Sequence, residues 1–231
     1  MKPIAYIHND FKEKFGIPRQ SGMLSEFKSQ ILFLKEYSVN EAVRGLEEFS
    51  HIWIIWEFSE AKRDVWSPTV RPPKLGGNKR MGVFATRSPF RPNPIGISCV
   101  QLDSIEYTKN GPILNIRGAD LMDNTPIYDI KPYLPFSDSY PDAKAGFTEE
   151  IKDVKLEVNI RSDEFNYLSY ELKKNIIDIL SSDPRPSYHN DDREYGIKYN
   201  EYNIRFNVIN NILNIISIEK LTEDGKNEKN K

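Results

Sequence analysis

The stretch GVFATRSPFRPNPIGIS, from Gly82 to Ser98, joins two apolar runs through a loop that contains three prolines. Each proline fixes its own φ and biases the preceding residue towards extended conformations. We therefore expect a strand over Met81–Thr86, a stiff loop, and a new strand from Ile95. The loop would hold Arg87 and Arg91 rigidly, as recognition of a carboxylate or phosphate requires. The alternative is a stiff connector whose arginines cover a neighbouring acidic patch.

Short segments of alternating apolar residues lie on both sides of this loop and predict strands. These segments are Pro3–His8, Ile31–Lys35, Ile52–Phe58, Met81–Thr86, Ile95–Leu102 and Ile113–Gly118. One early helix is expected, capped by Asn40 and running to about Phe49. Several short strands with a single helix predict a mainly β domain, either a barrel or a sandwich.

The pattern changes after Pro141, and we expect a small α+β domain over residues 144–221, after a main domain over 1–143. Residues 222–231 are charged and polar and predict a disordered tail. The expected elements are a strand over Val154–Ile160, a helix capped by Ser162 and ended at Asp183-Pro184, and a hairpin of Tyr202–Val208 with Ile212–Ile218. Asn210-Asn211 suits the tight turn of that hairpin.

Composition narrows the class of protein. Of the 231 residues, 39% are hydrophobic and 29% charged, which is typical of a globular protein. Cys99 is the single cysteine, which excludes an intramolecular disulfide and fits a cytoplasmic location. The three histidines lack metal-ligand spacing, so no metal is expected. The chain contains no apolar run of signal-peptide or membrane-spanning length, so we expect a soluble protein without membrane contact.

Charge is distributed unevenly along the chain. The net charge is −2, which argues against general coating of nucleic acid. However, no acidic residue occurs from Trp66 to Leu102, whereas this segment contains Arg71, Lys74, Lys79, Arg80, Arg87 and Arg91. This segregation favours one positive face, although a solvated surface with counter-charges from elsewhere in the fold remains possible.

Gly82–Ser98 resembles the signature of the TsaA-like (TrmO) family. Three further stretches resemble that family in the same order: Phe11–Gly22 (FKEKFGIPRQSG), Ala42–Trp53 (AVRGLEEFSHIW) and Leu121–Pro135 (LMDNTPIYDIKPYLP). The likeness covers roughly residues 3–143, and it is weaker at Asp183–Tyr188 and Tyr202–Phe206. Members of the family are S-adenosylmethionine-dependent methyltransferases that methylate N6 of threonylcarbamoyladenosine at position 37 of tRNA, beside the anticodon.

The resemblance implies a β-barrel methyltransferase that acts as a homodimer and holds its cofactor with loops. The chain contains no GxGxxG motif for a Rossmann turn, which agrees with this implication. Carried over by position, the S-adenosylmethionine pocket would comprise Pro18, Arg19, Gln20, Ser59, Glu60, Arg87, Ile97, Asp123, Asn124, Thr125 and Pro126. Arg19 or Arg87 would pair with the methionine carboxylate, and Ile97 would face adenine.

Two positions in the expected pocket depart from the family pattern. Many relatives have histidine at the position of Ser59 and glycine at the position of Asn124. Asparagine tolerates left-handed backbone almost as well as glycine, so the change at Asn124 is mild. The loss of an imidazole at Ser59 is larger. It keeps open a methyltransferase of the same fold that acts on another substrate.

Methylation of this nitrogen requires removal of a proton, because its lone pair is delocalised into the purine and a carbonyl group. The candidates lie in one short run, where Asp129 would take the proton and Lys131 or Tyr133 would stabilise negative charge. A structural Asp–Lys pair beside a core tyrosine is an equally open interpretation.

The tRNA anticodon loop would be bound through phosphate contacts and stacked bases. The candidates for phosphate binding are Arg71, Lys74, Lys79, Arg80, Arg91 and Arg185. The aromatic candidates for stacking are Trp66, Phe90 and Tyr188, which can also be simple packing residues. A second class of function, a non-catalytic RNA- or nucleotide-binding β module, fits the same basic face.

Overall fold

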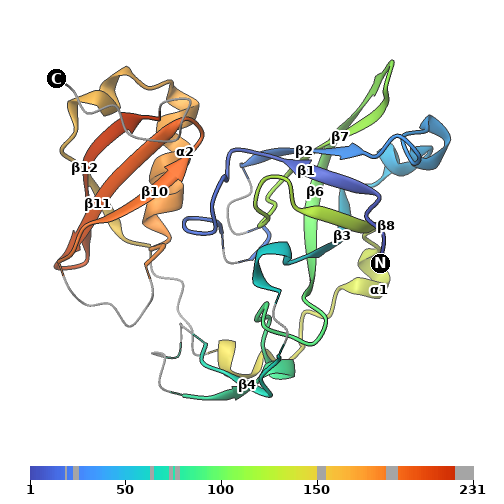
Figure 1. Ribbon diagram of the computed structural model, residues 1–231, viewed down its shortest axis with the longest axis horizontal. Coiled ribbons are helices and arrows are strands. Elements are labelled where there is room, and N and C mark those ends of the chain that lie inside the picture. The colour runs from blue at the N-terminus through green and yellow to red at the C-terminus, as the bar shows by residue number, and fades with distance from the viewer. Residues whose placement is uncertain are drawn as a thin grey trace. The chain divides into compact units, whose positions relative to one another are not determined.

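The computed structural model describes residues 1–18, 20–22, 26–62, 65–72, 75, 79–149, 155–185 and 192–221 (Figure 1). Its contacts divide the chain into two compact units. The first comprises residues 1–9 and 19–152, and the second comprises residues 10–18 and 153–231. The boundary expected between residues 143 and 144 stays a prediction, and the expected tail over 222–231 lies outside the described residues.

The first unit is a closed barrel of antiparallel strands in the order β1-β2-β7-β6-β3-β8. The strands are β1 (Ala5–His8), β2 (Lys28–Phe33), β3 (His51–Glu57), β6 (Ile95–Thr108), β7 (Gly111–Arg117) and β8 (Pro126–Pro132). Pairing of Ala5 with Ile127 and of Tyr6 with Pro126 closes the barrel between β1 and β8. The prediction of a mainly β domain is therefore confirmed, and the architecture is a barrel rather than a sandwich.

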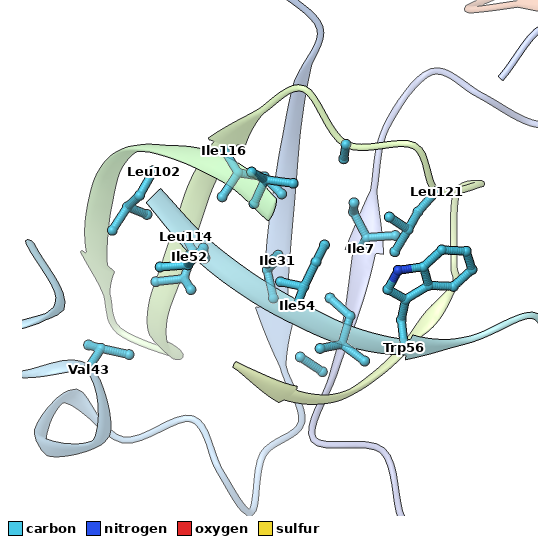
Figure 2. Packing of buried hydrophobic residues seen from close by; sticks show 14 residues of the cluster. Ile7, Ile31, Val43, Ile52, Ile54, Trp56, Leu102, Leu114, Ile116 and Leu121 are labelled. Carbon is cyan, nitrogen blue, oxygen red and sulfur yellow. The ribbon is translucent and has the colours of Figure 1, made fainter. Parts of the chain in front are cut away.

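Alternate side chains of each strand point into the barrel and form its core. Ile52, Ile54 and Trp56 of β3 are 4% exposed or less, and the same alternation fills the core from the other strands (Figure 2). Trp56 lies at one end of this core, and Val43 lies at the other. The strand predicted over Ile52–Phe58 is thus observed, and burial alternates along it with the two-residue period of a strand.

The alternation failed at β8, which the sequence analysis did not identify. A bulge opposite Ile55 and Trp56 inserts one residue, so Trp56 pairs with Ile127 and Ile55 with Asp129. The two core-facing residues Ile127 and Ile130 are consequently three positions apart instead of two. A strand with a bulge has no simple period in its sequence.

Two other predictions about the first unit are wrong. The strand expected over Met81–Thr86 ends at Gly82, because Thr86 donates from both its backbone N and its Oγ1 to the carbonyl of Val83 and closes a 3-10 turn. The helix expected from Asn40 is two 3-10 turns, since Gly45 has a φ of +84° and interrupts it. Asn40 does not cap a helix there.

The second unit contains a four-stranded sheet in the order β10-β11-β12-β9 and the helix α2 (Tyr170–Ser181). Its strands are β9 (Glu157–Ile160), β10 (Tyr195–Tyr199), β11 (Tyr202–Ile209) and β12 (Ile212–Lys220). The α+β prediction is confirmed, and so is the hairpin turn, where Asn210 and Asn211 have φ of +51° and +63°. Ser169 rather than Ser162 caps α2 and accepts from the backbone N–H of Leu172.

The segment Asp10–Pro18 packs on β10 within the second unit, an assignment that no pattern in its residues indicated. Phe11 contacts Tyr199 with ring centroids 5.3 Å apart, and Phe15 stacks on Tyr195 at 6.2 Å. Glu13 accepts the backbone N–H of Lys198 at 2.8 Å. The segment therefore supplies a hydrogen-bond partner to the edge strand β10. An open edge would be available for pairing with another strand.

The remaining elements are short. They are β4 (Thr69–Val70), β5 (Met81–Gly82), α1 (Pro135–Asp138), and the 3-10 turns η1 (Asn40–Val43), η2 (Leu46–Glu48), η3 (Ser59–Ala61), η5 (Val83–Ala85), η6 (Gly146–Thr148) and η7 (Asp163–Tyr167). Within the described ranges, no helix has the length and apolar character needed to cross a membrane.

The close approach of Gly96 to Trp56 supplies a test of the barrel. A Cβ added at Gly96 would overlap the indole of Trp56, whereas a Cβ at Gly82 would meet no atom within 4 Å. We expect Gly96→Ala to lower the free energy of unfolding by about 1–3 kcal/mol, measured by chemical denaturation, because the packed indole has to shift. Gly82→Ala is the control and should leave stability unchanged. Equal stability of both variants and the parent chain would contradict this packing.

Candidate functional site

Three connections of the barrel leave and return at the same end. Because neighbouring strands are antiparallel, the ends of β1, β3 and β7 lie beside the starts of β2, β6 and β8. The connections at this end are the β1–β2, β3–β6 and β7–β8 segments. They contain nine of the eleven residues expected to bind the cofactor, and the other two, Ile97 and Pro126, lie near the starts of β6 and β8. Topology thus brings together residues of three motifs that are far apart in the sequence, whereas the fourth, Ala42–Trp53, begins at the opposite end of the barrel.

Arg87 of the β3–β6 connection contacts a residue of the β1–β2 connection. Its Nη1 donates to Oε1 of Gln20 at 2.6 Å. Arg91 lies in the same connection, but its Nη1 donates to the backbone carbonyls of Val83 and Thr86 at 3.2 and 2.7 Å. Arg91 therefore holds the loop in shape from within, while Arg87 links two of the three connections.

The β7–β8 connection is a tight turn tied to the end of β1. Asp123 Oδ1 accepts the backbone N–H of Asn9 at 3.0 Å and lies 3.5 Å from Nδ1 of His8. The backbone of Asn124 has a φ of +60°, in the left-handed region. Glycine is otherwise favoured in this region. Thr125 is buried and donates from Oγ1 to the carbonyl of Met122 at 2.7 Å.

A polar cluster lies where β3 leads into η3, the turn that contains Ser59 and Glu60. Glu57 forms an ion pair with Lys62 at 2.9 Å. Burial and the neighbouring carboxylate of Glu57 raise the pKa of Tyr128 to about 12, so this phenol stays protonated and donates to Glu57. Ser59 is partly buried and Glu60 is exposed.

The outer face of the barrel joins the expected adenine contact to the expected catalytic residues. Asp129 of β8 pairs with Ile55 of β3, and Ile55 pairs with Ile97 of β6, so the three form one row. Two interstrand spacings separate Asp129 from Ile97, which is about 10 Å. The side chain of Ile97 is 51% exposed, and Lys131 Nζ lies 2.9 Å from Asp129 Oδ2.

Tyr133 lies away from this row. It follows β8 at the opposite end of the barrel, where its backbone N–H donates to the carbonyl of His51. Its ring contacts Trp53 and His51 with centroids 5.8 and 6.2 Å away. The structure therefore brings Asp129 and Lys131 together and places Tyr133 four residues beyond Asp129, about 13 Å along the chain.

The expected phosphate-binding residues fall into three groups. Arg71, Lys79 and Arg80 are exposed, and Arg80 donates to Oγ1 of Thr69 at 3.0 Å. Arg185 is 9% exposed and donates through Nε and Nη2 to both carboxylate oxygens of Asp183. Lys74 lies outside the described residues, as do the cofactor candidate Arg19 and the aromatic candidate Tyr188.

An exposed aromatic pair lies beside these cations. Trp66 and Phe84 are 46% and 70% exposed, with ring centroids 6.0 Å apart. The guanidinium of Arg91 lies 5.6 Å from the centroid of Phe84. The sequence analysis missed Phe84, although a phenylalanine within an acid-free run was a usable signal.

A second residue that the sequence analysis missed is Asp120, whose carboxylate lies at the end of the barrel core. It accepts from Ser98 Oγ at 2.5 Å. Within the described part of the chain, no cluster of histidine, cysteine or carboxylate side chains could hold a metal ion.

Comparison with protein families gives two matches. Residues 6–139 match the model of the tRNA-methyltransferase O N-terminal domain, and residues 152–221 match the model of the TrmO C-terminal domain. Together the matches cover both compact units.

Individual relatives agree with these family models. A tRNA (adenine(37)-N6)-methyltransferase of Escherichia coli strain K12 is 45% identical over 191 residues, which cover 80% of this chain and 81% of that protein. A putative S-adenosylmethionine-dependent methyltransferase of Pseudomonas aeruginosa, named RcsF, is 37% identical over 206 residues. The alignment covers 86% of this chain and 87% of that protein. A crystal structure of TrmO from P. aeruginosa matches with a TM-score of 0.74 and 30% identity, over 94% of this chain and 95% of the other.

Proposed function

This chain belongs to the tRNA-methyltransferase O family, and we propose that it transfers a methyl group from S-adenosylmethionine to N6 of adenine 37 in tRNA. The observation that carries the proposal is the meeting of three connections at one end of the barrel, where they assemble the expected cofactor residues. We further propose that the acceptor is threonylcarbamoyladenosine in the anticodon loop. A tRNA substrate also supports the expected cytoplasmic location.

The residues at this end suit S-adenosylmethionine chemically. Arg87 offers a guanidinium for the methionine carboxylate, with Gln20 as its neighbour at 2.6 Å. Ile97 offers an exposed apolar surface for adenine. The Asp123–Thr125 turn offers backbone groups for ribose hydroxyls, and Ser59 and Glu60 lie in the β3–β6 connection with Arg87. When bound, S-adenosylmethionine supplies an electrophilic methyl group on its sulfonium sulfur.

We propose that Asp129 accepts the proton that N6 loses as it gains the methyl group. Its carboxylate lies in the same row of the outer face as Ile97, on the wall beside the proposed pocket. Lys131, paired with Asp129 at 2.9 Å, would stabilise negative charge that develops on the carbonyl group attached to N6. Tyr133 remains a candidate only from the family resemblance, because it lies at the other end of β8.

The exposed cations Arg71, Lys79 and Arg80 are proposed to contact tRNA phosphates. They come from a stretch without acidic residues, Trp66–Leu102. No carboxylate of that stretch would therefore repel a bound phosphate. The neighbouring pair Trp66 and Phe84 would stack with an unpaired base of the anticodon loop. Arg91 and Arg185 are less suited to phosphate contacts, since both guanidinium groups already donate within the protein.

We also propose that the chain acts as a homodimer, as the family resemblance implies. The outer face of β3 and β6 carries the exposed Ile97 and the partly buried Ile55 and Trp53. Pairing of two copies through this face would remove apolar surface from water.

Removal of Arg87 tests the cofactor site. Arg87→Ala should raise the Kd for S-adenosylmethionine by about 10- to 100-fold, because it deletes a charge-assisted contact. Isothermal titration calorimetry of the purified chain measures this constant. Arg44→Ala removes an exposed arginine at the opposite end of the barrel and should leave the Kd unchanged. A chain that releases no binding heat with S-adenosylmethionine would instead support a plain RNA-binding module.

The activity itself is tested with tRNA from cells that lack this protein, in which the unmethylated nucleoside should accumulate. Added chain and S-adenosylmethionine should produce N6-methylated threonylcarbamoyladenosine, detected by mass spectrometry of nucleosides. Asp129→Asn should lower kcat about 100-fold or more, as expected for a general base, with an unchanged Kd for the cofactor. Asp142→Asn, at an exposed aspartate, should keep full activity. Near-normal turnover by Asp129→Asn would refute its role.

The proposed tRNA surface predicts two different kinds of loss. Lys79→Ala with Arg80→Ala should weaken tRNA binding about tenfold and reduce the dependence of log Kd on log salt by about one to two units. Phe84→Ala should weaken binding without changing that salt dependence, because stacking releases no counterions. Lys35→Ala with Lys109→Ala, at the opposite end of the barrel, is the control. Equal losses of tRNA and cofactor binding would contradict a separate RNA surface.

A further inference from the structure

A chain of buried hydrogen bonds runs from the barrel core to Asp120. Trp56 Nε1 donates to Ser98 Oγ at 2.9 Å, and Ser98 Oγ donates to Asp120 Oδ1 at 2.5 Å. The order of donors is fixed, since an indole N–H can only donate and the hydroxyl has one proton. Asp120 therefore acts as an acceptor at the end of this chain. Trp56, which Figure 2 shows in the core, is 4% exposed and Ser98 is 1% exposed, so both donors in this chain are buried.

The same carboxyl group also faces two of the connections at the proposed site. The backbone N–H of Ser21 and the positive charge of Arg87 both act to lower the pKa of this carboxyl group, which they do from positions on its side of the barrel end. Gln20, the residue before Ser21, accepts from Arg87. Asp120 thus links the rigid core to the β1–β2 and β3–β6 connections, and it lies in the third connection itself.

Stability of the barrel gives no reason for a carboxyl group at this point. Burial raises the pKa of Asp120, although Ser98, Arg87 and the backbone N–H of Ser21 act in the opposite direction. A raised pKa means that the folded chain binds the proton more tightly than the unfolded chain does. The ionised form therefore lowers stability as pH rises above the ordinary pKa of an aspartate, and a neutral residue would avoid this cost.

We propose that Asp120 is a positioning residue, which holds the Gln20–Ser21 segment, and through Gln20 and its own charge also Arg87, in the arrangement that binds S-adenosylmethionine. It acts through these neighbours and does not contact the methyl group or the acceptor nitrogen. This inference rests on the proposed function of the site. It adds to that function a residue, Asp120, that keeps the cofactor-binding residues in place.

The experiment is a double-mutant cycle on cofactor binding with the full-length chain. Asp120→Asn should raise the Kd for S-adenosylmethionine about tenfold in calorimetry, and should raise KM for the cofactor with little change in kcat. In an Arg87→Ala background the same substitution should change the Kd less than about twofold, because the residue that Asp120 positions is gone. Asp178→Asn, at an aspartate of α2, is the matched control and should have no effect on the Kd.

Each result of the cycle decides between positioning and a general structural role. An equal rise in Kd in both backgrounds, or no rise in either, would overturn the inference while the proposed function stands. Absence of S-adenosylmethionine binding by the parent chain would overturn the function itself, and the inference with it. Asp120→Ser is a second variant that leaves space for water. If neither variant folds, Asp120 belongs to the fold and the positioning role is rejected.

Discussion

The contact between Trp56 and Gly96 is the constraint on which the rest of the barrel depends. The two residues are paired across β3 and β6, and the indole lies on the backbone where a side chain would otherwise project. This close approach leaves room for the largest residue of the core at the end of the barrel where the three connections meet. The indole N–H donates to Ser98, and Ser98 in turn donates to Asp120. The packing of Trp56 therefore connects the barrel core to Asp120, at the end where the three connections meet.

The stiffness of the β3–β6 connection has two sources that act together. Prolines at 89, 92 and 94 restrict the backbone, and Arg91 closes the loop on itself through two carbonyls. The sequence showed two arginines in a rigid loop, and the structure separates their roles. One stabilises the loop from within, and the other, Arg87, is presented to the next connection.

The sequence predicted the elements that are regular over several residues. It did not predict the elements that a bulge or a turn interrupts. β3 and the start of β6 were predicted from short runs of apolar residues, such as Ile52–Trp56. β8 was hidden, since its bulge spaces Ile127 and Ile130 three residues apart. Gly45 interrupted the expected helix for the same kind of local reason. The motifs of the site were recognisable one by one, but their convergence is a property of strand order, which no single motif contains. Asp120 was missed because a lone aspartate in a loop has no distinguishing pattern.

The assignment of Asp10–Pro18 to the second unit has a consequence for fragments of the chain. The polypeptide passes between the two units at three places along its length, near residues 9, 18 and 152, instead of once. A chain cut after the barrel would keep Phe11, which is 3% exposed here, without the ring of Tyr199 that covers it. The remaining C-terminal fragment would lose the segment Asp10–Pro18, which packs on β10. The second unit is therefore completed by a segment that precedes most of the barrel in the sequence, so a fragment that begins at residue 153 would lack part of its own packing.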